Sequence, residues 1–219
     1  MNRAIICFTR VPKPGVTKTR LLPILTGQQC AALHTAFLTD LSAVYGQINA
    51  DLFVAYTYDP DWAVLKHIFP GAKGFISQDG LDLGEKMYNA LRHVLELGYE
   101  AAVLTGSDLP RMTVSHIESG FTALNQADLS IGPTSDGGYS LVGMKKPHRA
   151  LFENQQYGGN TVLENTIAAA KHACLSVSLA ASCDDVDTPA DLQALSGQLS
   201  PESATYRCIQ QFMKEGLLL

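Results

Sequence analysis

Residues 4–23 read A-I-I-C-F-T-R-V-P-K-P-G-V-T-K-T-R-L-L-P, an apolar run that opens into a basic loop. The run Ala4–Phe8 is typical of a buried strand. The stretch Phe8–Pro23 carries four of the chain's 16 Lys and Arg residues: Arg10, Lys13, Lys18 and Arg20. Guanidinium forks, ammonium groups and backbone N–H groups near a glycine such as Gly15 bind phosphate oxygens. The stretch therefore predicts a phosphate-binding loop at the end of a strand.

Two other interpretations of this loop are less favourable. A solvated connection is disfavoured because the formal net charge is −5, and single-sign charge clustered in an acidic chain is typical of a ligand site. The order Gly15-Val-Thr-Lys18-Thr19 approaches a nucleotide-binding P-loop, but that motif requires glycine directly before the lysine, where Thr17 stands. We expect a phosphate site of another kind.

Composition narrows the class of protein. With 219 residues, of which 46% are hydrophobic, the chain is long enough to form one domain over residues 1–219. Its acidity argues against a nucleic acid polymer as partner, and its apolar runs are too short to cross a membrane. The five cysteines are odd in number and scattered, without the spacing of a disulfide framework or a zinc site. A reduced, cytoplasmic protein is expected.

Apolar runs alternate with helical patterns along the chain. Strands are expected over residues 4–8, 51–56, 74–77, 101–105, 129–132, 139–144 and 175–179. Capping patterns place helix starts at Thr26, Ser115, Thr161 and Thr188, and further helices are expected within 59–69, over 85–97 and from residue 200. This alternation predicts an α/β fold whose mostly parallel sheet is covered on both faces. The two strands that follow Asp128 without a helix between them predict an antiparallel member, hence a mixed sheet.

Ligands of open α/β sheets bind beyond the carboxyl ends of the strands, where two acidic segments are expected. In Thr105-Gly-Ser-Asp108-Leu-Pro110, Asp108 is placed to hold a hard cation or, alternatively, only to stabilise a turn. In the second segment, 182–189, Asp185 and Asp187 have the spacing of side chains that share a face. The alternative role for this segment, helix capping, needs only Thr188 as the N-cap and Asp191 three residues later. A pair formed by Asp108 and Asp187 would suit Mg²⁺ or Mn²⁺.

Two further stretches are candidate ligand contacts. In Gly132-Pro-Thr-Ser-Asp136-Gly-Gly-Tyr139, Asp136 could grip an acceptor or act as its base, whereas a tight Asp-Gly hairpin turn is an equally open alternative. Residues 78–86 begin a helix whose N-terminus could meet a nucleobase or phosphate; the candidates there are Gln78, Gly84 and Lys86. The six histidines show no catalytic or metal-binding spacing and are interpreted as structural.

The motifs together resemble a bacterial family of glycosyltransferase-A-like, nucleotide-diphospho-sugar transferase-like proteins, the domain-of-unknown-function family 2064. They occur in the order F-x-R-x-P-x-P-G-x-x-K-T-R-L, D-L-G-x-K-M, G-S-D-L-P, G-P-x-x-D-G-G-Y-x-L-x-G and D-V-D-T-P-x-D-L. The chain is more distantly similar to the guanylyltransferases that make molybdenum-cofactor dinucleotide and that activate phospholactate. One departure is Tyr157-Gly-Gly-Asn-Thr161, where a tryptophan-containing segment would be expected.

The resemblance implies a three-layer, Rossmann-like sandwich and Mg²⁺-dependent transfer. By position, it implies that Arg10, Lys18 and Arg20 bind phosphates, that Asp108 and Asp187 hold the metal, and that Asp136 borders the acceptor pocket. Lys18, Arg20, Asp108 and Asp136 are thus the expected catalytic residues. Gly15 and the candidates of residues 78–86 complete the expected nucleotide site.

Three functions remain open at this point. Nucleotidyl transfer from a nucleoside triphosphate to a small phosphorylated acceptor fits a strongly basic loop, which would hold the leaving pyrophosphate. Glycosyl transfer from a nucleotide-diphospho-sugar needs the acidic pair more than the basic loop. A non-catalytic nucleotide-binding domain would predict lost acids, yet Asp108, Asp185 and Asp187 are present. The base, the acceptor and a homodimer through the apolar stretch 216–219 stay open.

Overall fold

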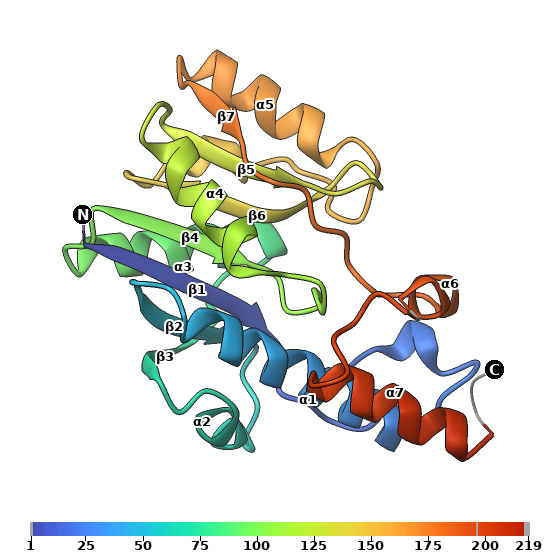
Figure 1. The fold of residues 1–219 in the computed structure, drawn as a ribbon. Helices are drawn as coiled ribbons and strands as arrows, with labels where there is room; N and C mark the ends of the chain where they lie inside the picture. Colours follow the sequence, from blue (N-terminus) through green and yellow to red (C-terminus); the bar gives the residue numbers. More distant parts are fainter. Residues whose placement is uncertain (1, 196, 217–219) are drawn as a thin grey trace.

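A computed structural model describes residues 2–195 and 197–216; the apolar end of the chain, residues 217–219, lies outside them. The described residues form one seven-stranded sheet in the order β3-β2-β1-β4-β6-β5-β7 (Figure 1). The strands are β1 (Arg3–Thr9), β2 (Asp51–Tyr56), β3 (Ala72–Ser77), β4 (Ala101–Thr105), β5 (Leu129–Pro133), β6 (Tyr139–Met144) and β7 (Val177–Leu179). β6 runs antiparallel to β4 and β5 while the other pairings are parallel, which confirms the mixed sheet.

Helices cover both faces of the sheet and make a three-layer sandwich. They are α1 (Gly27–Tyr45), α2 (Val64–Ile68), α3 (Leu83–Glu96), α4 (Val114–Leu124), α5 (Val162–His172), α6 (Pro189–Ala194) and α7 (Ala204–Lys214), with 3₁₀ turns η1 (Thr19–Leu21) and η2 (Arg149–Leu151). Every described helix is too short or too polar to cross a lipid bilayer.

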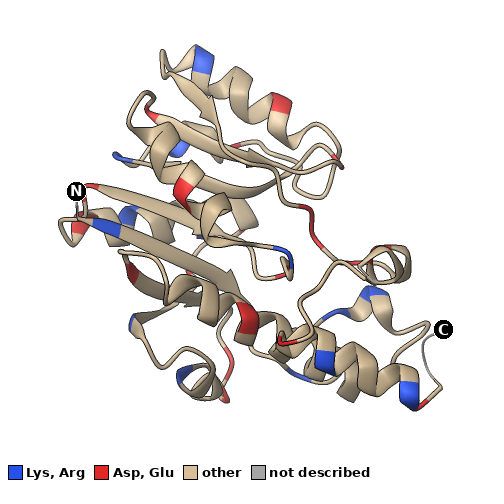
Figure 2. Ribbon diagram, viewed as in Figure 1, with Lys and Arg blue, Asp and Glu red and all other residues tan. Residues whose placement is uncertain are grey.

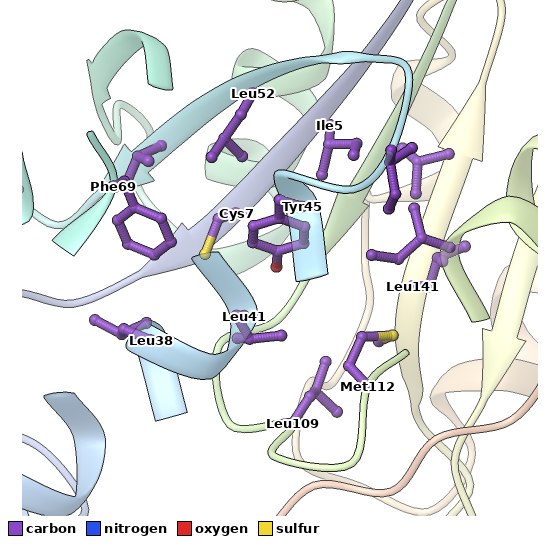
Figure 3. Close-up of a cluster of buried hydrophobic side chains, with 14 of the residues drawn as sticks. Ile5, Cys7, Leu38, Leu41, Tyr45, Leu52, Phe69, Leu109, Met112 and Leu141 are labelled. Atoms are coloured by element: carbon purple, nitrogen blue, oxygen red, sulfur yellow. The ribbon is translucent and has the colours of Figure 1, made fainter. Parts of the chain in front are cut away.

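Alternation along β1 explains the layers. Ile5 and Cys7 point to a core shared with α1, α2 and α4, whereas Ala4 and Ile6 point to a second core shared with α3 and α5. Figure 3 shows the first core, in which Tyr45 of α1 lies among these apolar side chains. Both cores are buried because each residue of a central parallel strand faces a helix layer.

A third hydrophobic cluster lies beside the sheet and joins segments far apart in the sequence. α7 packs along α1 (Figure 1), and side chains of η1 and α6 complete the cluster. Its buried members are Leu21, Leu25, Cys30, Leu33, Phe37, Val186, Leu192, Leu195, Ile209 and Phe212. Asp40 of α1 anchors α7, since its carboxylate accepts hydrogen bonds from the N–H groups of Ala204 (2.7 Å) and Thr205 (2.9 Å).

Two of the four predicted helix caps are confirmed, and three predicted helix starts need correction. The capping boxes at Thr26 and Thr188 are confirmed. Ser115 is not the cap of α4: Thr113 caps it, and His116 closes the box. Thr161 precedes α5 but makes no side-chain capping bond. The helix expected from residue 200 begins at Ala204 with Ser203 as its cap.

Candidate nucleotide site at the β1–β4 switch point

The main cleft lies where the strand order reverses. From β1 the chain proceeds outward to β2 and β3, then returns to β4 on the opposite side of β1. The connections after β1 and β4 therefore leave the sheet in opposite directions and open a crevice beyond their carboxyl ends. This cleft measures about 480 Å³. Its lining residues are Phe8, Thr9, Arg10, Thr17, Lys18, Thr19, Arg20, His34, Thr57, Gln78, Leu83, Lys86, Gly106, Ser107, Asp108, Asp185 and Asp187.

Backbone bonds bring the two predicted acidic segments together. The N–H of Val186 donates to the carbonyl oxygen of Asp108 at 2.9 Å, so the loop after β4 and the segment after β7 run side by side. The cap of α6 is completed by Asp191, which accepts from the N–H groups of Asp187 and Thr188. The Asp187 carboxylate takes no part in this cap and lines the cleft. Figure 2 shows the acidic colour on the connection between β7 and α6.

Lys18 lies between these acids. Its Nζ donates to the carbonyl oxygen of Val186 at 2.6 Å and to Oδ1 of Asp187 at 3.1 Å, and it forms an ion pair with Oδ1 of Asp108 at 2.6 Å. The side chain is only 1% exposed and lies over the ring of Phe37. The sequence predicted an ammonium group that faces phosphate; in the structure this group is directed inward.

The backbone of Lys18 has φ 53° and ψ 37°, the left-handed region that glycine favours. A non-glycine residue there costs about 1–3 kcal/mol and is retained when its surroundings fix it. The contacts of its ammonium group with both acids supply that constraint. Thr17 stands where the P-loop motif would have a glycine, and Lys18 itself adopts the left-handed conformation of the turn.

Charge in the cleft shifts the pKa values of two carboxyl groups in opposite directions. Burial alone would raise the pKa of Asp108, but the charge of Lys18 and the contact with His34 bring it well below its usual range. Desolvation in the cleft is the main cause that raises the pKa of Asp185 to about 7, and the negative charges of Asp108 and Asp187 add to it. Asp185 nevertheless remains exposed to solvent. The site therefore contains closely spaced acids whose repulsion a cation relieves.

His34 of α1 is a site residue that the sequence analysis missed. The side chain is 4% exposed, and Nδ1 lies 3.4 Å from Oδ1 of Asp108. Its Nε2 lies 3.3 Å from both the carbonyl oxygen of Arg10 and the hydroxyl of Thr9. The imidazole thus links the carboxylate of Asp108 to the end of β1. No sequence motif identifies it, because only the packing of α1 on the sheet brings it to Asp108.

Three predicted cations and one amide line the open part of the cleft. Arg10 and Arg20 are exposed; Arg20 reaches Oδ2 of Asp187 at 3.3 Å, and Arg10 contacts only the carbonyl oxygen of Val16 at 3.4 Å. Lys86 of α3 also lines the cleft, and among the described residues its side-chain ammonium group forms no ion pair. Gln78 donates to the carbonyl oxygens of Thr9 and Ala55, which ties together the ends of β1, β2 and β3.

Lys13 lies outside the cleft lining. Its ammonium group pairs with the carboxylates of Asp59 (3.1 Å) and Asp61 (3.0 Å).

Gly15, Gly84 and Asp136 do not line the cleft. Gly15 occupies a turn at φ 73°. Gly84 packs against the carbonyl oxygen of Phe152, where a Cβ atom has no room. Asp136 accepts hydrogen bonds from the Thr134 hydroxyl and the N–H of Gly138, as the hairpin-turn alternative predicts. The roles of these three residues toward a ligand stay predictions.

The donor set suits a divalent metal ion. Asp108 and Asp187 both direct an oxygen at one point, the position of the Lys18 ammonium group, and each side chain keeps 36% exposure on the cleft side. Among residues 2–195 and 197–216, no three His, Cys, Asp or Glu side chains form a complete metal cage. Mg²⁺ is usually held by one or two carboxylates plus substrate phosphates, so two acids beside the predicted phosphate site would be sufficient.

Solved structures with a similar fold indicate the structural class of this protein. A chain from Desulfovibrio desulfuricans G20, named "putative nucleotide-diphospho-sugar transferase", is 30% identical with a TM-score of 0.88, over 99% of this chain and 97% of that one. A cytidylyltransferase of Leptospira borgpetersenii is 13% identical with a TM-score of 0.53, over 99% and 95% of the two chains. The fold is that of the nucleotide-diphospho-sugar transferases and nucleotidyltransferases.

Within that class, the chain belongs to the family described as "Uncharacterized protein conserved in bacteria (DUF2064)", whose model matches residues 40–159. A third similar structure, CMP:2-keto-3-deoxy-manno-octonic acid synthetase complexed with CTP, is 12% identical with a TM-score of 0.53, over 89% of this chain and 97% of that one. The comparison with curated proteins found no match.

Proposed function

We propose that this protein is a Mg²⁺- or Mn²⁺-dependent nucleotidyltransferase that uses a nucleoside triphosphate and a small phosphorylated acceptor. One observation carries the proposal: the cations Arg10, Arg20 and Lys86 line the same switch-point cleft as the acids Asp108 and Asp187. These three cations complement the negative charge of a triphosphate chain, and the two acids suit the metal ion that accompanies it.

In the proposed reaction, an acceptor phosphate oxygen attacks the α-phosphorus of the triphosphate. A new P–O bond forms, the bond between the α-phosphorus and the α,β-bridging oxygen breaks, and pyrophosphate leaves with that oxygen. Such a transfer needs positioning and charge stabilisation more than covalent chemistry from the protein. The metal ion, held by Asp108 and Asp187, would neutralise phosphate charge.

The chain's own residues divide this work. The guanidinium groups of Arg10 and Arg20 would bind the β- and γ-phosphates and stabilise the leaving group. Lys18 and His34 hold Asp108 in place. The negative charge of Asp136, in the β5–β6 turn, contributes to the raised pKa of Asp185. This proximity supports the proposal that the turn borders the acceptor.

Neighbouring folds support a nucleotide donor. One similar structure contains CTP, another is named a cytidylyltransferase, and a third is 4-diphosphocytidyl-2C-methyl-D-erythritol synthase. The name of the 30% identical relative favours a second candidate, glycosyl transfer from a nucleotide-diphospho-sugar. In that reaction an acceptor hydroxyl would attack the sugar carbon, and a nucleoside diphosphate would leave.

A thermal-shift panel distinguishes the two candidates, because a ligand that binds the native state raises the melting temperature. The panel contains the four nucleoside triphosphates and common nucleotide sugars, each with and without Mg²⁺. We expect the largest Mg²⁺-dependent shift with a triphosphate. A larger shift with a nucleotide sugar would support glycosyl transfer instead. The absence of any shift would favour a protein without this nucleotide chemistry.

A further inference from the structure

The ammonium group of Lys18 is a cation that the chain itself places between the two predicted metal ligands. Its Nζ lies 2.6 Å from Oδ1 of Asp108 and 3.1 Å from Oδ1 of Asp187. A side-chain amine that bridges two carboxylates occupies the position where an ion shared by both would be held.

This ammonium group is not available to an incoming phosphate in the structure. Lys18 has three N–H donors, and three oxygen atoms surround it: those of Val186, Asp108 and Asp187. The side chain is 1% exposed, and the ring of Phe37 lies 5.0 Å from Nζ. Withdrawing it would leave Asp108 and Asp187 close together without the cation that lies between them.

The exposed cation of the same loop behaves differently. Arg20 contacts Oδ2 of Asp187 at 3.3 Å, and its side chain is 68% exposed. It can turn toward a phosphate at little cost, since a solvent-exposed ion pair contributes little to stability. The loop thus combines one buried cation that compensates the acids with exposed cations that are free for a ligand.

We infer that Lys18 is an internal counter-ion that prevents Asp108 and Asp187 from binding a divalent ion on their own, so that the ion enters only together with the triphosphate. The second part of this inference rests on the proposed function; the first does not. A metal ion that arrives alone must compete with a cation already in place. A metal–triphosphate chelate brings additional oxygen ligands and negative charge, and it needs only the carboxylate oxygens that face the cleft.

The first test measures Mn²⁺ binding to the free protein by calorimetry. Wild type, Lys18→Met and Lys66→Met are compared; methionine keeps an unbranched side chain without the charge, and Lys66 is an exposed lysine of α2 outside the cleft lining. We expect no Asp108-dependent binding to wild type below about 1 mM Mn²⁺. Lys18→Met should bind at least about tenfold more tightly, and Lys66→Met should resemble wild type. Equal affinity in wild type and Lys18→Met would overturn the inference.

The wild-type protein provides a second test that does not depend on the folding of Lys18→Met. Tight Mn²⁺ binding to free wild type that is lost in Asp108→Asn would show that Lys18 does not block the acids, and would overturn the inference. Circular dichroism of each variant confirms that the compared proteins are folded.

The third arm separates this inference from the proposed function. Non-hydrolysable α,β-methylene triphosphates of the four bases are titrated into wild type with and without Mg²⁺. We expect affinity to increase about tenfold or more with Mg²⁺ for the preferred base. If no analogue binds, the proposed function fails, while the Mn²⁺ titrations still decide whether Lys18 blocks the acids. Binding that does not depend on Mg²⁺ would contradict the joint entry of ion and triphosphate.

Discussion

The hydroxyl of Tyr45, in α1, lies 2.7 Å from the hydroxyl of Thr105, the last residue of β4. Both side chains are buried, and burial is the main cause that raises the pKa of Tyr45 well above its ordinary value. This bond fixes the end of β4 immediately before Gly106-Ser107-Asp108. It thereby helps to position Asp108, an acid of the candidate site.

Tyr45→Phe removes this bond and leaves the Thr105 hydroxyl without its partner. We expect the free energy of unfolding to fall by about 1–2 kcal/mol, measured by urea denaturation. Tyr58→Phe is a matched control, since Tyr58 is 72% exposed, and should change it by less than about 0.5 kcal/mol. Equal effects of the two substitutions would show that the buried bond does not stabilise the fold.

Arg20→Ala removes an exposed cation of the cleft. We expect affinity for the triphosphate to fall about tenfold or more, because charge-assisted bonds to phosphate are lost, while affinity for the nucleoside stays unchanged. Calorimetric titrations of both ligands measure the difference. Arg92→Ala, which removes an arginine paired with Glu96 on α3, serves as the control. Parallel weakening of nucleoside and triphosphate would assign Arg20 a structural role.

Asp108→Asn keeps the shape of the side chain and removes its charge. We expect turnover to fall by about 10² or more under saturating Mg²⁺, while the circular dichroism spectrum stays that of a folded protein. Asp61→Asn, at a 71% exposed carboxylate paired with Lys13, is the control and should keep full activity. A variant with unchanged turnover and Mg²⁺ dependence would remove Asp108 from the metal site.

Asp51 links β2 to Lys73 of β3 and to Tyr99, whose hydroxyl donates to its carboxylate at 2.6 Å. The hydrogen bond from Lys73 makes the largest contribution and that from Tyr99 the next, and together they lower the pKa of Asp51 below 3.8. Because the folded state then binds its proton less readily than the unfolded state, the stabilisation is present above that value and is lost as the pH falls.

Asp51→Asn should therefore lower the urea midpoint at pH 7, and the midpoints of variant and wild type should converge as the pH falls below about 3.8. Asp79→Asn, at an acidic residue outside this network, is the control. A constant difference between Asp51→Asn and wild type at all pH values would show that the charge of Asp51 is not the cause.

Gly84→Ala tests whether Gly84 acts in packing or at the ligand. An added Cβ atom would meet the carbonyl oxygen of Phe152 and the ring of Tyr157, so we expect the free energy of unfolding to fall by about 1–3 kcal/mol. Gly71→Ala, where a Cβ meets nothing within 4 Å, should have little effect. Unchanged stability combined with lost nucleotide binding would instead support the predicted ligand role.

The fold was largely predictable because its signals are local. The apolar runs that form β1, β2 and β4 are bounded by turns, and the absence of a helix between β5 and β6 indicated the antiparallel strand. The caps were less predictable. Glu118 has the spacing of a capping partner for Ser115, but Arg3 binds it from a distant strand at 2.7 Å. Tertiary pairing of this kind overrides a local pattern.

The candidate site was predictable only as to which segments meet. The rule that ligands of open α/β sheets bind beyond the carboxyl ends of the strands indicated the loops after β1, β4 and β7. Seven of the predicted site residues line the cleft: Arg10, Lys18, Arg20, Gln78, Lys86, Asp108 and Asp187. The inward direction of Lys18 depends on its positive φ, which a threonine–lysine–threonine sequence does not indicate. The position of His34 likewise depends on helix packing.

The third hydrophobic cluster has a consequence for biosynthesis. It unites η1, which follows the first strand, with α6 and with Ile209 and Phe212 of α7. Chains fold from the N-terminus as they emerge, so the sheet can form while these apolar surfaces of η1 and α1 still lack their cover. The cluster is complete only once α7 has been synthesised, because Ile209 and Phe212 are among its buried members. A chain that lacks α7 would therefore leave apolar side chains of η1, α1 and α6 without part of their cover, next to the segments that border the cleft.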